Sequence, residues 1–320
     1  MSNIQKIENV SHEEMLELRR KGVGGSDISV VCGENPWRTR YQLWLNKTGI
    51  GDQEKEDKLA FEVGTALEQT VADLACSRLS YMLKREVRCH KTNFTTIKDG
   101  FKIANPDRLF YDFGQDKTLL ECKTTSPFGK DEWGTEYSPK IPRAYEHQIN
   151  WYCGILGYEK AIIACLIGGS IDFVMRFWDY DHEMFLWQES EAEKFWNLVT
   201  NKLPPKATGD DLQLLRNIPK CDAVKSVEQS EVDRYMTVSQ EISLLKEQLK
   251  PLEKELSDIK ASMLQELEGC DGVSRDYQIK NTVVMRKEVD MKGLEKDYPG
   301  IFKKYVVSKP SYNKLTFKEI

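Results

Sequence analysis

The seven tryptophans of this 320-residue chain all lie before residue 197. Large aromatic side chains need an interior in which to be buried, so this stretch is the part of the chain that builds a core. The segment LPPKATGDD (203–211), rich in residues that break helices and strands, follows it. The remainder is rich in lysine and glutamate. We therefore expect two domains, residues 1–205 and residues 206–320.

Composition and cysteine spacing exclude several classes of protein. Apolar residues make up 40% of the chain and aromatic residues 10%, which is enough for a core and excludes wholesale disorder. No window approaches the ~18–20 apolar residues of a membrane span. The start, MSNIQKIENVSHEEM, lacks the apolar segment of a secretory signal, so we expect a cytoplasmic location and no membrane partner. The closest two of the eight cysteines are twelve positions apart, which argues against a zinc or iron–sulfur cluster.

The first domain alternates helical periods with short apolar runs. A capping box at Ser11 and Glu14 predicts a helix that ends near Gly22, and Ser26 or Asp27 is expected to cap the short helix after it. This order of helices and strands indicates an α/β fold in which a sheet is flanked by helices. We predict further helices at 57–80, 141–156 and 181–200, and strands at 83–95, 100–112, 117–124, 161–167 and 173–178.

The second domain opens with apolar residues spaced alternately three and four apart. They are Tyr235, Val238, Ile242, Leu245, Leu249, Leu252, Leu256, Ile259 and Met263. This series predicts the seam of a coiled coil or helical hairpin over about 230–268. Because Pro251 removes a backbone donor inside it, we expect two helical arms of one bent or folded-back element. A small α+β segment is expected over about 275–320, with strands near 277–290 and 314–318 around a helix at 291–297.

The segment NPDRLFYDFGQDKTLLECK (105–123) places three charged side chains at the ends of two predicted strands. Strand alternation puts Glu121 and Lys123 on one face, and pairing of the strands as a hairpin brings Asp107 near Glu121. Paired carboxylates are hard oxygen ligands suited to Mg²⁺, and a lysine beside them can orient a water and offset phosphate charge. This combination is typical of a metal-dependent phosphodiesterase.

Chance is the alternative explanation of a Glu-x-Lys triplet. The chain has 46 basic and 51 acidic side chains, and Glu56-Asp57-Lys58 shows the same spacing inside a charged run. The triplet in LLECK differs because its charges end an apolar strand, where an unpaired charge is costly.

Five segments carry a more specific pattern. They are GVGGSDISVVCGENPWRTRYQLWLNKTG (22–49), GTALEQTVA (64–72), ANPDRLF (104–110), LLECKTTSP (119–127) and IPRAYEHQINWYCGILG (141–157). In this order they resemble the YqaJ-type viral recombinase family, the lambda-exonuclease-like branch of the PD-(D/E)XK nucleases. The resemblance spans residues 11 to about 200. It implies a restriction-endonuclease-like core, a central mixed sheet flanked by helices, to which a C-terminal helical and small α+β appendage is attached.

Carried over position by position, the resemblance implies a metal site. Asp107 and Glu121 would be the paired ligands, and the backbone carbonyl of Cys122 would complete the set. Lys123 would position the nucleophilic water. Glu68 would reach a second metal or a bound water, although a solvated helix residue is the alternative for this position.

The same resemblance implies contacts to the substrate. Gln148 would contact the catalytic lysine, the water or a phosphate. The alternative is a buried Gln that only forms structural hydrogen bonds with the backbone. Ser26, with Arg19 or Arg20 nearby, would hold the DNA end or its terminal phosphate. The alternative for Ser26 is a plain helix cap, and for the arginines a solvated surface.

The function implied by the family is a Mg²⁺-dependent deoxyribonuclease for which Mn²⁺ would substitute. It would degrade linear double-stranded DNA from an end, 5′ to 3′, in phage-type recombination within a bacterial host cell, the chain being encoded by a phage or prophage. The implied partners are DNA ends, further copies of the chain in a homo-oligomer or ring, and a single-strand annealing protein. A net charge of −5 opposes a generally basic DNA-binding coat but leaves room for a local basic groove.

Two other functions remain open on the sequence. One is a structure-specific endonuclease built on the same core. The other is a catalytically idle DNA-binding or assembly protein that uses the heptad region, which would be marked by a missing carboxylate or lysine. Asp107, Glu121 and Lys123 are all present.

Overall fold

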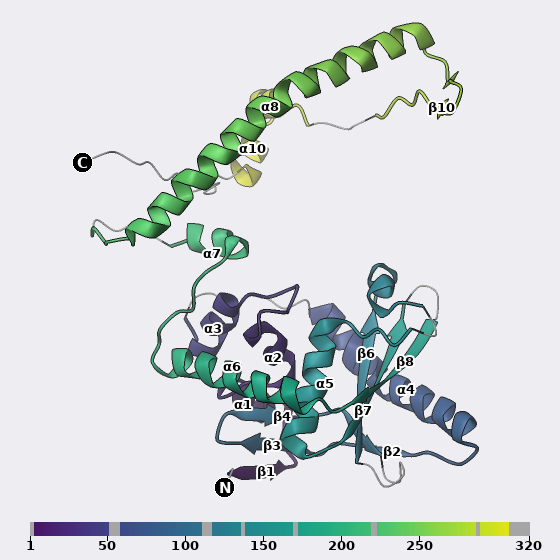
Figure 1. Cartoon of the computed structure of the whole chain (residues 1–320), viewed down its shortest axis with the longest axis vertical. Helices are drawn as coiled ribbons and strands as arrows, with labels where there is room; N and C mark the ends of the chain where they lie inside the picture. The colour runs from purple at the N-terminus through teal and green to yellow at the C-terminus, as the bar shows by residue number, and fades with distance from the viewer. Residues whose placement is uncertain are drawn as a thin grey trace. The chain divides into compact units, whose positions relative to one another are not determined.

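The computed structural model describes residues 3–50, 58–110, 117–135, 138–168, 172–218, 223–285 and 289–306. The chain divides into two compact units, Met1–Leu215 and Arg216–Ile320 (Figure 1). Each unit has its own set of helices and strands. Among the described residues, no helix is both long and apolar enough to cross a membrane.

A five-stranded mixed sheet is the centre of the first unit. All neighbouring strands are antiparallel except β6 and β7, which are parallel and are joined through helix α5 (Arg143–Leu156). A parallel pair needs such a crossover connection, and the intervening helix supplies it. The strands, in spatial order, are β2 (Cys89–Lys91), β5 (Arg108–Phe110), β6 (Thr118–Thr125), β7 (Lys160–Ile167) and β8 (Asp172–Asp179).

Helices cover both faces of this sheet, which confirms the predicted α/β architecture (Figure 1). Alternate residues of one strand enter different apolar clusters: Leu119 packs with residues of α5, and Leu120 packs with residues of α4 (Lys58–Leu83). On the α5 side, Phe195 of α6 (His182–Thr200) is also fully buried. The run at 161–167 is buried on both faces, as its continuous apolar sequence predicts.

A smaller three-stranded sheet lies at the N-terminal side of this unit. It consists of β1 (Ile4–Glu8), β3 (Phe94–Lys98) and β4 (Lys102–Ala104). Helices α1 (His12–Arg20), α2 (Gly25–Val31) and α3 (Arg40–Thr48) belong to the same region of the chain. The capping box predicted at Ser11 and Glu14 is present at the start of α1.

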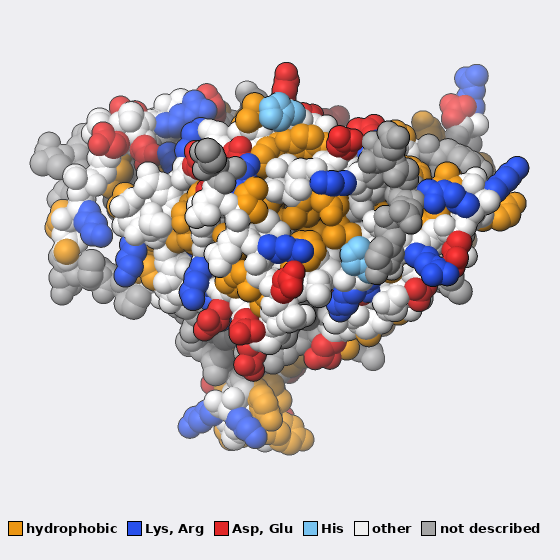
Figure 2. All heavy atoms as spheres, turned by 90° about the horizontal axis from the view of Figure 1, so that it is seen from below, with side chains coloured by type: hydrophobic (Ala, Val, Ile, Leu, Met, Phe, Trp, Pro, Cys, Tyr) orange, Lys and Arg blue, Asp and Glu red, His pale blue; other side chains and the backbone are white. Residues whose placement is uncertain are grey.

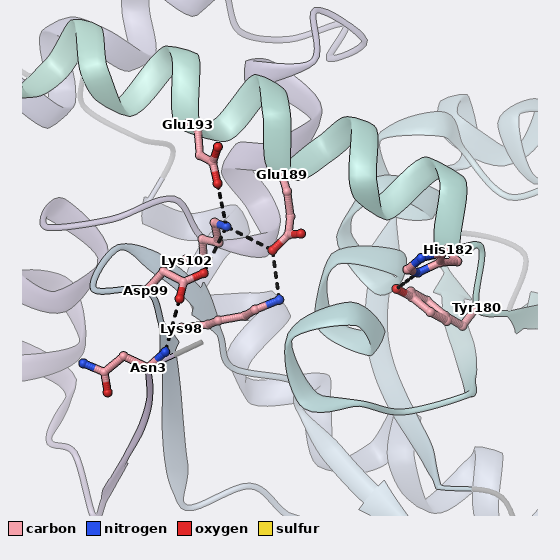
Figure 3. A network of polar contacts seen from close by, with 8 residues as sticks. All are labelled: Asn3, Lys98, Asp99, Lys102, Tyr180, His182, Glu189 and Glu193. Carbon is pink, nitrogen blue, oxygen red and sulfur yellow. Dashed lines mark hydrogen bonds and ion pairs between the residues drawn. The ribbon is translucent and has the colours of Figure 1, made fainter. Parts of the chain in front are cut away.

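A buried lysine ties the smaller sheet to α6 (Figure 3). Lys102 is 3% exposed, and its ammonium lies 3.0–3.1 Å from carboxylate oxygens of Asp99, Glu189 and Glu193. Lys98 pairs with Glu189 at 2.9 Å. A buried charge is tolerated when it is paired and hydrogen-bonded, and here three carboxylates meet that condition.

Two predicted strands differ from the structure. The strand predicted at 100–112 is two strands in different sheets, β4 and β5, because Asn105-Pro106 separates them and Pro106 has no backbone N–H to donate. In the stretch predicted as a strand at 83–95, α4 ends at Leu83, β2 covers only Cys89–Lys91, and Phe94 opens β3.

The second unit contains one long helix, α8 (Gln229–Leu267), which runs through Pro251. The expectation of a folded-back element with two separate arms is therefore wrong. The proline removes one hydrogen bond from the helix, and that loss does not divide a segment of 39 residues.

The rest of the second unit is irregular apart from short elements. Of the strand predicted at 277–290, only Gln278–Ile279 forms, as β10, paired with β9 (Gly272–Val273). The predicted helix at 291–297 is confirmed as α9 (Met291–Asp297) and is followed by α10 (Pro299–Tyr305). The strand predicted at 314–318 lies outside the described residues. The first unit also contains 3₁₀ turns at Pro127–Trp133 and Gly209–Asp211, and α7 (Leu212–Arg216) spans the boundary between the two units.

Candidate active site

A cleft of about 670 Å³ in the first unit brings together residues that are distant in the sequence. Helices α1, α2, α4 and α5 and strand β6 all contribute to its wall. Two of the predicted site residues, Arg20 and Cys122, are not among its lining side chains. The predicted residues that line it are Arg19, Ser26, Glu68, Asp107, Glu121, Lys123 and Gln148.

The paired carboxylates come from the β5–β6 hairpin. Its antiparallel register pairs Arg108 with Leu120, so Asp107, one residue earlier, comes beside Glu121. Oδ2 of Asp107 accepts a hydrogen bond of 2.8 Å from the backbone N–H of Cys122. This geometry agrees with the hairpin expected from the sequence, and the pairing of adjacent strands is what creates it.

Alternation along β6 separates the polar side chains from the apolar ones. Leu120 and Cys122 pack in the cluster with α4, whereas Glu121 and Lys123 face the cleft. The Lys123 ammonium lies 2.7 Å from Oε1 of Glu121 and 5.1 Å from the centre of the Tyr145 ring. The side chain of Glu121 is 3% exposed, so this charged pair is largely removed from water.

Glu121 has one carboxylate oxygen that the described residues leave without a partner. Its Oε1 accepts hydrogen bonds from Lys123 at 2.7 Å and from Gln148 Nε2 at 2.5 Å. Its Oε2 is buried and has no hydrogen-bond partner. A buried, unpaired acceptor is costly, and a cation bound at this oxygen would remove the cost.

Asp107 is also held in an environment that disfavours its charge. Burial, and then the negative charge of Glu121, raise the pKa of Asp107 to about 8. Burial alone would lower the pKa of Lys123, but the carboxylates of Glu121 and Asp107 raise it above its usual value. Lys123 is therefore an ammonium group at neutral pH, paired with Glu121 and close to Asp107.

These residues fit a divalent cation. Within the described part of the chain, no group of three or more His, Cys, Asp or Glu side chains is arranged to hold a metal ion. A cation here would rely on two carboxylates that repel each other, those of Asp107 and Glu121, together with backbone oxygen and water. Hard oxygen donors of this kind are what Mg²⁺ takes, usually with few protein carboxylates and several waters.

Glu68 reaches the cleft from α4, but it has a cationic partner that the sequence analysis missed. Arg108 donates to Oε1 of Glu68 through Nη1 and to Gln69 through Nη2 at 3.1 Å. Arg108 also donates to the backbone carbonyl of Asp107 at 2.8 Å. The side chain of Arg108 is 3% exposed, and this arginine, which opens β5, links Glu68 of α4 to the backbone of Asp107.

Gln148 links the carboxylate of Glu121 to a second helical turn. Its side-chain nitrogen lies 3.2 Å from the hydroxyl of Tyr152, one turn further along α5. Tyr152 packs against the start of α2 so closely that a Cβ on Gly25 would lie 2.4 Å from its ring. Gly25 is thus required for a close approach of α2 to α5, a role that the sequence alone did not reveal.

Ser26 lies in the first turn of α2 and does not cap it. The N-cap is Gly24, whose N–H donates to Asp27 at 3.0 Å, and Asp27 is paired with Lys47 at 2.6 Å. The sequence-based assignment of the cap to Ser26 or Asp27 is therefore corrected. Because the helix already begins at Gly25, the hydroxyl of Ser26 does not cap it and accepts a hydrogen bond from Arg19 Nη2 at 2.8 Å.

Charged side chains of both signs are mixed on one face of the molecule. On the face shown in Figure 2, basic and acidic side chains are interspersed and no broad patch of one sign is visible. Inside the cleft, Lys91 lies 3.8 Å from Glu68, and Arg19 and Lys123 add two further cations. The cations of the cleft are thus placed among its carboxylates.

Known proteins were compared with the chain as a whole. A sequence profile of the YqaJ-like viral recombinase domain matches residues 14–159. An uncharacterised protein of Bacillus subtilis strain 168, named YqaJ, is 29% identical over 324 residues, which is 99% of this chain and 97% of that protein. The stretch matched by the profile contains every site residue named above, from Arg19 to Tyr152.

Solved structures with a similar fold include two exonucleases. An alkaline exonuclease from Laribacter hongkongensis is 20% identical, with a TM-score of 0.45, covering 60% of this chain and 94% of that chain. A phage-related exonuclease from Haemophilus somnus 129PT is 14% identical, with a TM-score of 0.40, covering 59% of this chain and 99% of that chain.

Proposed function

We propose that this chain is a metal-dependent deoxyribonuclease of the YqaJ-like viral recombinase family, whose sequence profile matches residues 14–159. The observation that carries the proposal is the unpaired, buried Oε2 of Glu121 beside Asp107. A carboxylate pair that is unfavourable without a cation, and that shares a cleft with a lysine, is suited to phosphodiester hydrolysis.

Asp107, Glu121 and the backbone carbonyl of Cys122 would hold Mg²⁺, or Mn²⁺ in its place. When bound, the ion polarises the scissile phosphate and lowers the pKa of a bound water. Lys123, as an ammonium, donates hydrogen bonds but cannot accept a proton, so its role is to position the water and offset phosphate charge. Gln148 holds the Glu121 carboxylate in orientation, and Glu68, held by Arg108, faces the same cleft.

We propose linear double-stranded DNA as the substrate, degraded from its end in the 5′-to-3′ direction. The Arg19–Ser26 pair at the cleft is suited to a terminal phosphate, because a guanidinium and a hydroxyl both donate to phosphate oxygens. From the resemblance to the family we propose this polarity and a role in phage-type recombination beside a single-strand annealing protein. On the same ground we propose a homo-oligomeric state and a cytoplasmic location in a bacterial host.

Digestion of a duplex labelled separately at each 5′ and 3′ end tests this function. With Mg²⁺, the 5′ label should be released first as mononucleotides, and a covalently closed circle should survive. No cleavage without a divalent cation is expected. Release that begins at the 3′ label would overturn the polarity, cleavage of the closed circle would indicate an endonuclease, and absence of cleavage with Mg²⁺ and Mn²⁺ would overturn the nuclease assignment.

A further inference from the structure

Helix α8 exposes a continuous apolar stripe. Of its residues, from Gln229 to Leu267, none is buried. Leu245, Leu252 and Leu256 are 61–68% exposed. Such an exposed stripe on a solitary helix is a docking surface, because it cannot be buried within one helix. The stripe, here named the α8 seam, comprises Tyr235, Val238, Ile242, Leu245, Leu249, Leu252, Leu256, Ile259 and Met263.

The proline does not interrupt this seam. With Leu249 and Leu252 at the a and d positions of a heptad, Pro251 takes position c, on the outer side of the helix. The carbonyl that loses its hydrogen bond belongs to Glu247, at position f, which is also outside the seam. The helix is continuous over all the heptads, so a partner helix can follow the seam along its whole length.

The residues that flank the seam suit a second copy of the same helix. In a parallel, in-register pair, a g position of one helix faces the e′ position five residues on. Glu241 then faces Lys246, and Glu255 faces Lys260, whereas the other such pairs include a neutral residue. In an antiparallel pair, the a positions of one helix pack against the d positions of the other. Lys246 then lies opposite Glu253, and no two like-charged residues at the flanking e and g positions lie opposite each other. Either direction therefore combines opposite or neutral side chains.

We propose that the α8 seam binds the α8 seam of another copy of this chain. The seam spans 29 residues with nine apolar positions and no polar side chain at a or d. A heptad pattern sustained over three to four repeats with complementary flanking charges is the pattern of a coiled coil. The pairing is independent of the proposed nuclease chemistry, because no site residue lies on α8.

Two leucines on adjacent positions give a matched test. Leu245 lies in the seam and is 64% exposed, whereas Leu244 lies outside it at position c and is 60% exposed. In sedimentation of the full chain, Leu245→Glu should weaken self-association by about a hundredfold, because it places a charge in the apolar interface. Leu244→Glu should sediment like the unchanged chain. Circular dichroism checks that both variants keep their helical content.

Substitutions that reverse the charge of lysine side chains are a second test. Lys246→Glu with Lys260→Glu removes attraction beside the seam, and Lys250→Glu with Lys254→Glu changes net charge equally at positions outside it. Only the first pair should weaken association, and more strongly at low salt. A monomeric full chain at tens of micromolar, which would mean that the seam is covered within the chain or by a different protein, would overturn the proposal. So would equal association by Leu245→Glu and Leu244→Glu.

Discussion

The side-chain amide of Gln148 donates a hydrogen bond of 2.5 Å to Oε1 of Glu121, and the two residues are 27 positions apart in the sequence. The crossover helix α5 is thereby connected to the strand that supplies a metal ligand of the proposed site. An oriented carboxylate binds a cation better than a free one, since the cost of ordering it is already met.

Replacement of Gln148 tests this connection. We expect Gln148→Leu to raise the Mg²⁺ concentration needed for half-maximal cleavage by about 10–100-fold, the usual range for outer residues of a metal site. Tyr152→Phe, which removes a hydroxyl that does not touch Glu121, should have a smaller effect. Titration of cleavage rate with Mg²⁺ measures both. An unchanged Mg²⁺ dependence with a reduced maximal rate would indicate that Gln148 contacts substrate instead.

The raised pKa of Asp107 predicts how the metal-free protein responds to pH. The pKa of this carboxyl is about 8 in the folded chain and 3.8 when it is free in water, so between these pH values the folded state holds a proton that the unfolded state releases. Stability without metal should therefore fall as pH rises from about 4 to about 8. Melting temperatures across this range should fall less for Asp107→Asn. A steeper fall for the variant would contradict the assignment.

The same shift predicts the pH dependence of metal binding. A cation competes with the proton on Asp107, so apparent Mg²⁺ affinity should increase as pH rises toward about 8 and change little above it. Asp107→Asn and Glu121→Gln should abolish metal-dependent cleavage while the fold is retained, because each change relieves carboxylate repulsion. Isothermal titration at several pH values measures the affinity, and cleavage by either variant at the unchanged rate would remove this pair from the site.

Replacement of Lys123 should impair catalysis without preventing metal binding. We expect Lys123→Met to reduce turnover by about 10²–10⁴-fold, because the positioned water and the charge opposing the phosphate are both lost. Mg²⁺ should still bind, since both carboxylates remain. Titration of Mg²⁺ binding beside a single-turnover cleavage assay distinguishes these effects. Loss of metal binding together with loss of folding would make Lys123 a structural partner of Glu121.

The two neighbouring arginines of α1 form a matched pair for the DNA end. Arg19 lines the cleft and donates to Ser26, whereas Arg20 is not part of the cleft wall. If Arg19 and Ser26 hold a terminal phosphate, duplexes with 5′-phosphate should be digested faster than duplexes with 5′-hydroxyl. Arg19→Ala should lower the rate on phosphorylated ends by about tenfold or more, as a charge-assisted contact is lost. Arg20→Ala should leave this rate unchanged. An equal loss of rate in both variants would refute a specific role of Arg19 at the DNA end.

Local sequence patterns predicted the parts of the site that lie on one hairpin. Alternation along β6 put Glu121 and Lys123 on one face, and strand pairing brought Asp107 to them. Two predictions at element boundaries were wrong. The strand predicted over 100–112 ignored Pro106, and the chain does not fold back at Pro251. Propensity rules weigh one residue at a time, whereas the continuity of an element depends on all of its neighbours.

Contacts between distant segments could not be predicted from those patterns. Arg108 meets Glu68, 40 residues away, because α4 packs against the sheet to which β5 belongs. The approach of Gly25 to Tyr152 depends on the packing of α2 on α5. A weak signal existed for each: a basic residue directly after Asp107 in a strand that had to be buried, and two adjacent glycines at the start of a helix. Neither signal identifies its partner.

A chain without the second unit must be cut at a position that keeps Asp211. Asp211 is fully buried, and its carboxylate accepts hydrogen bonds from the Thr39 hydroxyl at 2.6 Å and from the Thr208 N–H at 2.8 Å. A cut before Asp211 would leave Thr39, the cap of α3, without this partner. A stop after Ile218 keeps Asp211 and every residue of the cleft.

The shortened chain should bind Mg²⁺ and cut short duplexes at a rate within about threefold of the full chain, since all proposed catalytic residues precede the cut. It should digest long duplexes less processively and lose the association that depends on α8. Light scattering and end-labelled digestion of short and long duplexes measure these properties. A folded truncation that binds Mg²⁺ yet cannot cut short duplexes would mean that the second unit contributes directly to the active site.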